Sequence, residues 1–331
     1  MKIQSGRKTL ATVLVMLVIA ATITWLGYHS LTRKPAPTGD NPFEYDIETY
    51  RHVPEEMIRY TQIRQIPVNL DKLLALAVAA DKRICVSGDN KILQYDADGK
   101  IARSFNLTAS AQCLAIASNY RLFLGVGNHI EIYDTTGALV KRWPPFDANS
   151  FITSLAVTHE AVFAADAGKL IILRYDLNGN LLNKIGEKDT TRDIPGFIIP
   201  SPYFDVAVDP DGFIWGANTG RLLLENFTPE GGPRSHWGTS SMRIEGFSGC
   251  CNPSHFAILS DGSFVTAEKG LERVKIYDRA GQFIAVVAQP SLFRQGTAGL
   301  DLAVDSDDCI YVLDSGARQV RIFQHKNSIN G

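Results

Sequence analysis

Two adjacent cysteines followed by a histidine form the most chemically unusual string in the sequence. Residues 249–255 read GCCNPSH, so Cys250 and Cys251 lie shortly before His255. Adjacent cysteines can form a vicinal disulfide, act as a redox pair, or offer two thiolates to a metal ion with the histidine nearby. Free cysteine is also a small buried residue, so plain packing is a further interpretation. The sequence leaves these options open and specifies no cofactor.

Four other polar residues occupy equivalent places in a repeated pattern. Each follows an alanine in an apolar segment, by eleven residues for Asn218, Glu268 and Asp314 and by ten for Asp166. If the repeats form one ring, these side chains approach one mouth of its central channel and could bind a ligand there. Alternatively, they accept hydrogen bonds from backbone amides between the repeats.

The common catalytic motifs are missing from the sequence. It contains no CxxC, no CxxCH haem-attachment motif, no HExxH and no Walker loop. Catalysis is therefore the alternative hypothesis and binding the leading one. As an enzyme, the chain would be a metal-dependent lyase or hydrolase, or a thiol redox factor, working at the channel mouth.

A repeat of about 45 residues positions these side chains. An alanine flanked by apolar residues occurs six times, at residues 76–78, 114–116, 155–157, 206–208, 256–258 and 302–304. Each copy continues through a turn, a second apolar strand and a third strand that usually ends near Tyr-Asp-x-x-Gly. This period is typical of four-stranded propeller blades, so we predict an all-β propeller of six blades.

The last copy supplies only three strands, which predicts how the ring closes. Met57–Ile66 precedes the first copy and is the natural fourth strand of the last blade. Pairing the two ends of the chain in one blade removes the exposed edges of an open ring.

Two stretches near the C-terminus resemble NHL repeats. Residues 309–323 read CIYVLDSGARQVRIF, and FVTAE at 264–268 followed by RVKIY at 273–277 is similar. The likeness covers about residues 58–326. It implies a six-bladed β-propeller and suggests the amide-capping role for Asp314. It does not imply one activity, because that family includes scaffolds, peptide and RNA binders, and a few metal-dependent enzymes.

The N-terminal region has the features of a membrane anchor. Residues 10–28 read LATVLVMLVIAATITWLGY without a charge, and a helix of this length reaches about the thickness of a bilayer core. Basic residues precede this run, which favours a cytoplasmic N-terminus at residues 1–9. We predict a single-pass inner-membrane protein with a linker at 29–56, a periplasmic propeller at 57–326 and a tail at 327–331. A cleaved signal peptide is the alternative.

Charge and loop lengths indicate which kind of partner to expect. The chain has 331 residues and a formal net charge of -2, with no dense Lys/Arg cluster, which argues against nucleic-acid binding. The longest loops, Gly186–Tyr203, Gly238–Pro253 and Pro290–Gly299, should open on one face of the ring. The leading hypothesis is a membrane-tethered binding or assembly module with a protein or small-ligand partner on this long-loop face. A structural subunit of a membrane complex is a further alternative.

Overall fold

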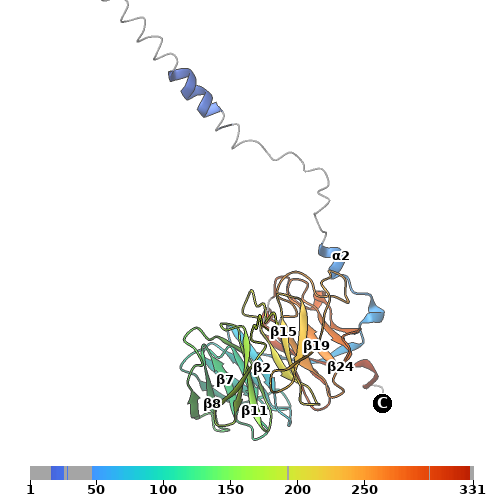
Figure 1. Ribbon diagram of the computed structural model, residues 1–331. Coiled ribbons are helices and arrows are strands. Elements are labelled where there is room, and N and C mark those ends of the chain that lie inside the picture. The colour runs from blue at the N-terminus through green and yellow to red at the C-terminus, as the bar shows by residue number, and fades with distance from the viewer. Residues whose placement is uncertain (1–15, 26–27, 29–46, 192–193, 298, 329–331) are drawn as a thin grey trace, which may run out of the picture. The chain divides into compact units, whose positions relative to one another are not determined.

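Six antiparallel sheets of four strands each form a ring in the computed structural model (Figure 1). The model describes residues 16–25, 28, 47–191, 194–297 and 299–328, and all six sheets lie in the unit Glu48–Gly331. The first strands of the six blades contact one another in succession and line the channel. The chain is therefore an all-β six-bladed propeller, as the repeat predicts.

Strands run outward from the channel in chain order within the first five blades. Blades 1 to 3 contain β2 (Leu73–Val78), β3 (Ile84–Gly88), β4 (Lys91–Tyr95), β5 (Ile101–Asn106); β6 (Cys113–Ile116), β7 (Leu122–Val126), β8 (His129–Tyr133), β9 (Leu139–Trp143); β10 (Ile152–Val157), β11 (Ala161–Asp166), β12 (Ile171–Asp176) and β13 (Leu181–Ile185). Blades 4 and 5 contain β14 (Val206–Val208), β15 (Ile214–Asn218), β16 (Leu223–Phe227), β17 (Pro233–Trp237); β18 (His255–Ile258), β19 (Phe264–Ala267), β20 (Val274–Tyr277) and β21 (Phe283–Ala288).

Short helical segments flank the strands. They are the α-helix α2 (Ile47–Arg51) and the 3-10 helices η1 (Glu55–Met57), η2 (Pro290–Leu292) and η3 (Lys326–Ser328). Arg51 at the end of α2 forms an ion pair with the buried carboxylate of Glu272, with Nη1 and Oε2 2.5 Å apart. This contact attaches the segment before the first strand to blade 5.

Turns with the sequence Asp-x-x-Gly join the third and fourth strands of several blades. In the turn after β8, the Asp134 carboxylate accepts hydrogen bonds from the amides of Thr136 and Ala138, at 2.8 and 3.0 Å. Gly137 closes the turn with a φ of 83°, a left-handed conformation that costs glycine little. The Asp-x-x-Gly spacing therefore predicts these hairpins correctly.

Apolar seams between neighbouring blades form the core. Each of the six buried clusters combines side chains from two adjacent blades, so the seams follow one another around the ring. Burying an aromatic or aliphatic side chain in such a seam contributes roughly 1.5–3 kcal/mol relative to leaving it exposed. A blade without its neighbour would expose an apolar face, so the blades depend on a complete ring.

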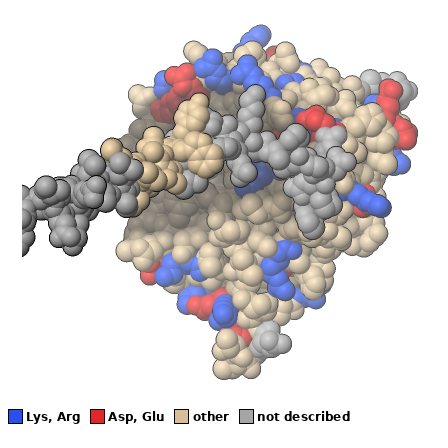
Figure 2. Space-filling view, turned by 90° about the horizontal axis from the view of Figure 1, so that it is seen from above, with Lys and Arg blue, Asp and Glu red and all other residues tan. Residues whose placement is uncertain are grey.

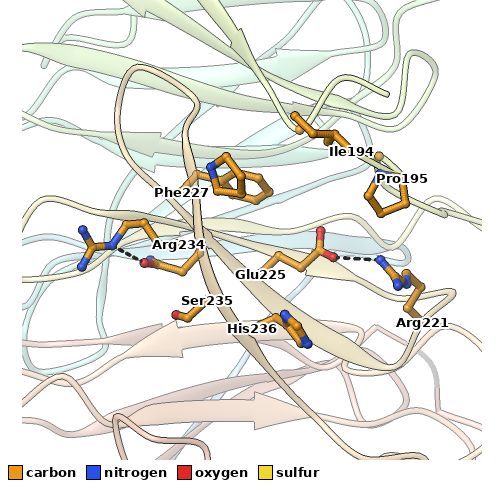
Figure 3. A pocket seen from close by; sticks show the side chains of 12 residues that line it. Ile194, Pro195, Arg221, Glu225, Phe227, Arg234, Ser235 and His236 are labelled. Carbon is orange, nitrogen blue, oxygen red and sulfur yellow. Dashed lines mark hydrogen bonds and ion pairs between the residues drawn. The ribbon is translucent and has the colours of Figure 1, made fainter. Parts of the chain in front are cut away.

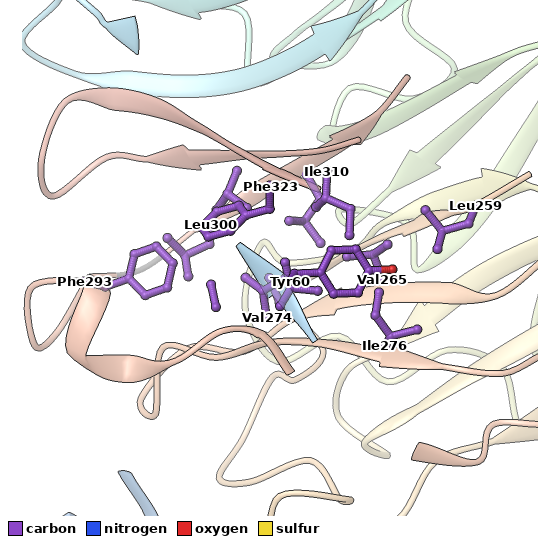
Figure 4. Close-up of a cluster of buried hydrophobic side chains, with 14 residues drawn as sticks. Tyr60, Leu259, Val265, Val274, Ile276, Phe293, Leu300, Ile310 and Phe323 are labelled. Carbon is purple, nitrogen blue, oxygen red and sulfur yellow. The ribbon is translucent and has the colours of Figure 1, made fainter. Parts of the chain in front are cut away.

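The N-terminal strand completes the last blade, as the sequence predicts. Strand β1 (Tyr60–Pro67) pairs antiparallel with β24 (Gln319–His325), outside β23 (Ile310–Asp314) and β22 (Asp301–Val304). The first residue of β1, Tyr60, is 8% exposed and packs in the seam between blades 5 and 6 (Figure 4). Residues from the two ends of the chain thus share one sheet and one core cluster.

The described part of the N-terminal unit includes one helical stretch. Residues 16–25 are helical and exposed. Among the described residues, none of the helices is both long and apolar enough to cross a membrane. The predicted anchor at 10–28 is described at residues 16–25 and 28, and the predicted linker at 29–56 is described only from residue 47.

Removing β1 tests the closure of the ring. A chain that begins at residue 43 retains β1 and should keep the free energy of unfolding of the longer protein. A chain that begins at residue 71 leaves the outer edge of β24 unpaired and opens the seam around Tyr60. It should lose several kcal/mol, on the order of the whole stability of a domain. Equal unfolding curves in urea for the two chains would contradict the closure.

Candidate functional site

A small polar cavity lies in the central channel, lined by residues of the innermost strands. Its volume is about 100 Å³, and its walls include Asp205, His255 and Asp301 from blades 4, 5 and 6. Each of these residues stands two places before the repeated alanine of its blade, as Ser154 does in blade 3. The ring brings together side chains that are about fifty residues apart in sequence.

The two carboxylates bridge neighbouring blades. Asp205 accepts a hydrogen bond from the Phe256 amide of blade 5 at 2.9 Å, and Asp301 accepts one from the Leu76 amide of blade 1 at 2.7 Å. The Ser154 hydroxyl accepts a bond from the Val206 amide at 3.2 Å and also donates to Asp205. These bonds fasten the inner strands across the blade seams.

His255 lies between the two carboxylates. Its Nδ1 is 3.3 Å from Asp301 Oδ1 and 3.6 Å from Asp205 Oδ2. Burial lowers the pKa of His255, but the hydrogen bond to Asp205 and the two negative charges outweigh it, so the pKa is raised overall. Burial also raises the pKa of Asp301 to about 6, against the effect of the neighbouring histidine. This group of three side chains can hold a proton inside the channel.

The size of the channel cavity limits its chemistry. A volume of about 100 Å³ has room for several water molecules. Within the described ranges, no group of three or more His, Cys, Asp or Glu side chains is arranged to hold a metal ion.

The four polar residues predicted at the channel mouth have no exposed surface. Asp166, Asn218, Glu268 and Asp314 are all 0% exposed. Asp166 accepts a bond from the Phe151 amide at 2.9 Å, and Asn218 accepts one from the Ile198 amide at 2.9 Å. Asp314 accepts a bond from the Ala317 amide and pairs with Arg321 at 2.8 Å. Their contacts follow the amide-capping interpretation.

Glu268 belongs to a fully buried charge cluster that the sequence analysis did not predict. Its carboxylate pairs with Arg273 Nε at 2.8 Å and with Lys275 Nζ at 3.1 Å. Lys275 also donates to the carbonyls of Ile244 and Gly246, at 3.1 and 2.6 Å. Burial lowers the pKa of Lys275 to about 8, opposed by Glu268. Through the hydrogen bonds of Lys275, the cluster fixes the long loop before blade 5.

The cysteine pair is divided between solvent and interior. Both residues are free thiols in this structure. Cys250 is exposed, whereas Cys251 is 2% exposed and has a left-handed backbone with a φ of 68°. Cys251 is as buried as the strand cysteine Cys85, although its place in a long loop predicts an accessible thiol. The Asn252 side chain fixes this turn through bonds to Ser248 O and to the Lys269 amide.

The three long loops enter the innermost strands on the same face of the ring as the hairpins between second and third strands. Tyr203, at the end of the loop before blade 4, meets the His255 ring edge-on at 5.9 Å between centroids. The Lys269 ammonium lies 4.8 Å from the Tyr203 ring. Ile198 in the same loop is 51% exposed. The long-loop face therefore carries half-buried side chains next to His255 and the exposed Ile198.

Comparisons with known proteins support the fold alone. A scan against protein-family models finds no match, and a sequence search of curated proteins also finds none. Among solved structures, the chain is similar to virginiamycin B lyase from Staphylococcus aureus, with 14% identity, a TM-score of 0.52, and coverage of 79% of this chain and 84% of that one. A streptogramin B lyase structure has 10% identity, a TM-score of 0.55, and coverage of 81% and 98%.

A third similar structure is a chain of a multiprotein complex. A chain in a crystal structure of a mitotic checkpoint complex has 12% identity and a TM-score of 0.55, with coverage of 88% of this chain and 98% of that one. At these identities the likeness shows a β-propeller and transfers no activity. The likeness to NHL repeats remains a resemblance in sequence.

Thiol labelling tests the placement of the cysteines. Iodoacetamide should add one label to the native protein, at Cys250, because the other four cysteines are buried. Burial also raises the pKa of the Cys85 thiol to about 12, so little of the reactive thiolate is present there. Peptide mass analysis locates the label. Rapid labelling of Cys251 as well would show that this part of the loop is open.

Proposed function

We propose that the protein is a propeller binding module whose long-loop face binds a protein partner. The observation that carries this proposal is that the insertions before blades 4, 5 and 6 emerge on one face and are held by buried polar side chains. Asn218 binds the first loop, Lys275 and Glu268 the second, and Glu272 the third through the Gly296 amide at 2.9 Å. Loops fixed in advance lose little conformational freedom on binding, which favours recognition.

The chemistry of the long-loop face suits a protein partner. Its exposed residues include the apolar Ile198, the basic Lys188 and Arg243, and the thiol of Cys250. A mixture of apolar and charged groups is typical of protein interfaces. On the face shown in Figure 2, basic and acidic side chains are interspersed, without the continuous basic field that nucleic-acid binding favours.

The catalytic alternative has less support from the site. Two of the similar structures are named as lyases, but the channel cavity is small, and the thiols of Cys250 and Cys251 are not exposed together. The channel cluster of Asp205, His255 and Asp301 uses its carboxylates to fasten the blades. A structural subunit would share the fold and would need a fixed neighbour on this same face.

We further propose that the N-terminal segment attaches the module to a membrane, with the propeller outside the cytoplasm. The support is the uncharged run at residues 10–28 and the basic residues before it. A tether restricts partners to those near the membrane surface and raises their effective concentration.

Site-specific photo-crosslinking tests the binding face. The full-length protein is produced in its native cells with benzoylphenylalanine at position 188 or 198 on the long-loop face. The matched control carries it at position 211, an exposed site in the turn between β14 and β15 on the opposite face. Irradiation should give an adduct of one mass from both loop positions and none from 211. The same adduct from 211, or none from either loop position, would contradict the proposal.

A further inference from the structure

One position of the third strand differs among the blades in a way that singles out blade 4. The side chain two places before the last aromatic residue of that strand is Leu93, Glu131, Leu173, Glu225, Lys275 and Arg321 in blades 1 to 6. Four blades thus place a charge on the same face of the same strand. Because the position repeats, each charge can be compared with its equivalents in other blades.

In the other three charged blades, short contacts within the protein satisfy this group. Glu131 accepts a bond from the Tyr133 hydroxyl at 2.8 Å and pairs with Arg142 at 2.5 Å. Lys275 donates to the Gly246 carbonyl at 2.6 Å. Arg321 pairs with Asp314 at 2.8 Å. Such short charge-assisted contacts are the strong ones.

Glu225 instead faces a cavity. Its carboxylate is 3.4 Å from Arg221 Nη1, the side chain is 15% exposed, and it lines a space of about 430 Å³ (Figure 3). Burial raises the pKa of Glu225, and Asn218, Arg221 and His236 offset this only in part. For Glu131, by contrast, burial is outweighed by its partners and the pKa is lowered. Blade 4 leaves its carboxylate less well partnered than blade 2 does.

The cavity combines this ion pair with apolar walls. Ile194 and Pro195 approach from the long loop before blade 4, and Phe227 and Pro233 come from β16 and its hairpin (Figure 3). The volume lies within the range of small-molecule sites, roughly 300–1,000 Å³. A ligand here would meet the Glu225 carboxylate and the Arg221 guanidinium side by side, next to an apolar surface. Arg234 and His236 also line the cavity, and Arg234 Nε already donates to Asn226 Oδ1 at 2.9 Å.

We propose that this cavity binds a small zwitterion with an apolar side chain, of the α-amino acid class. The ligand ammonium pairs with the Glu225 carboxylate and the ligand carboxylate with the Arg221 guanidinium. Its side chain packs on Ile194, Pro195 and Phe227. A ligand with one charge can pair with only one of Glu225 and Arg221, whereas a zwitterion can pair with both at short range. The long loop before blade 4 contributes to both this site and the proposed partner interface, but ligand binding in the cavity does not require the partner.

Calorimetric titration of the full-length protein tests the site, with L-phenylalanine, phenethylamine and 3-phenylpropionate as probes. L-Phenylalanine should bind at least tenfold more tightly than either singly charged probe. Glu225→Gln should weaken its binding at least tenfold. The matched control is Glu230→Gln, which removes the same charge from the exposed turn after β16 and should leave binding unchanged.

A second variant guards against loss of fold. Arg221→Gln changes a side chain that is 39% exposed, so the fold should survive, and binding of L-phenylalanine should again fall at least tenfold. Melting curves confirm that each variant is folded. The proposal is overturned if L-phenylalanine does not bind, if it binds folded Glu225→Gln or Arg221→Gln as it binds the unmodified protein, or if phenethylamine alone binds equally well.

Discussion

The pairing of the first strand with the last is the constraint on which the rest of the structure depends. Every apolar seam joins two neighbouring blades, so a blade at the end of an open ring would expose an apolar face to solvent. Strand β1 supplies the outer edge of blade 6 and places Tyr60 in the seam with blade 5. With the ring closed, six inner strands surround the central channel, and the long loops and outer parts of the blades form the surface around it.

Buried charges in this protein hold backbone in place. Asp205 and Asp301 fasten inner strands across seams, and Glu268 with Lys275 anchors the long loop before blade 5. Burying such groups is costly unless hydrogen bonds and opposite charges surround them, and the contacts to backbone amides and cations supply these. Glu225 differs from the charged groups at the equivalent position of the third strand in blades 2, 5 and 6, because its nearest cation is 3.4 Å away and a cavity lies beside it. This difference is the ground on which we propose a binding site there.

The sequence predicted the ring well and its polar residues poorly. The repeated alanine and the Asp-x-x-Gly turns could be predicted because they reflect local backbone chemistry. The missing fourth strand of the last blade followed from counting the strands of each copy. Burial of Cys251 and the joint contacts of Asp205 and Asp301 depend on how blades meet, which no local pattern encodes. Aligning the copies at the alanine would have placed Asp205, His255 and Asp301 at one position. Aligning the third strands would have singled out Glu225.

Hydrogen exchange of the native full-length protein tests the closed ring most directly. If β1 is an integral strand of blade 6, its amides should exchange only when the whole propeller unfolds. Their opening free energy should then match that of the buried strand β23 within about 1 kcal/mol. Exchange of the β1 amides at far lower free energy, while β23 stays protected, would show that the strand detaches by itself and would contradict a ring closed by its N-terminal strand.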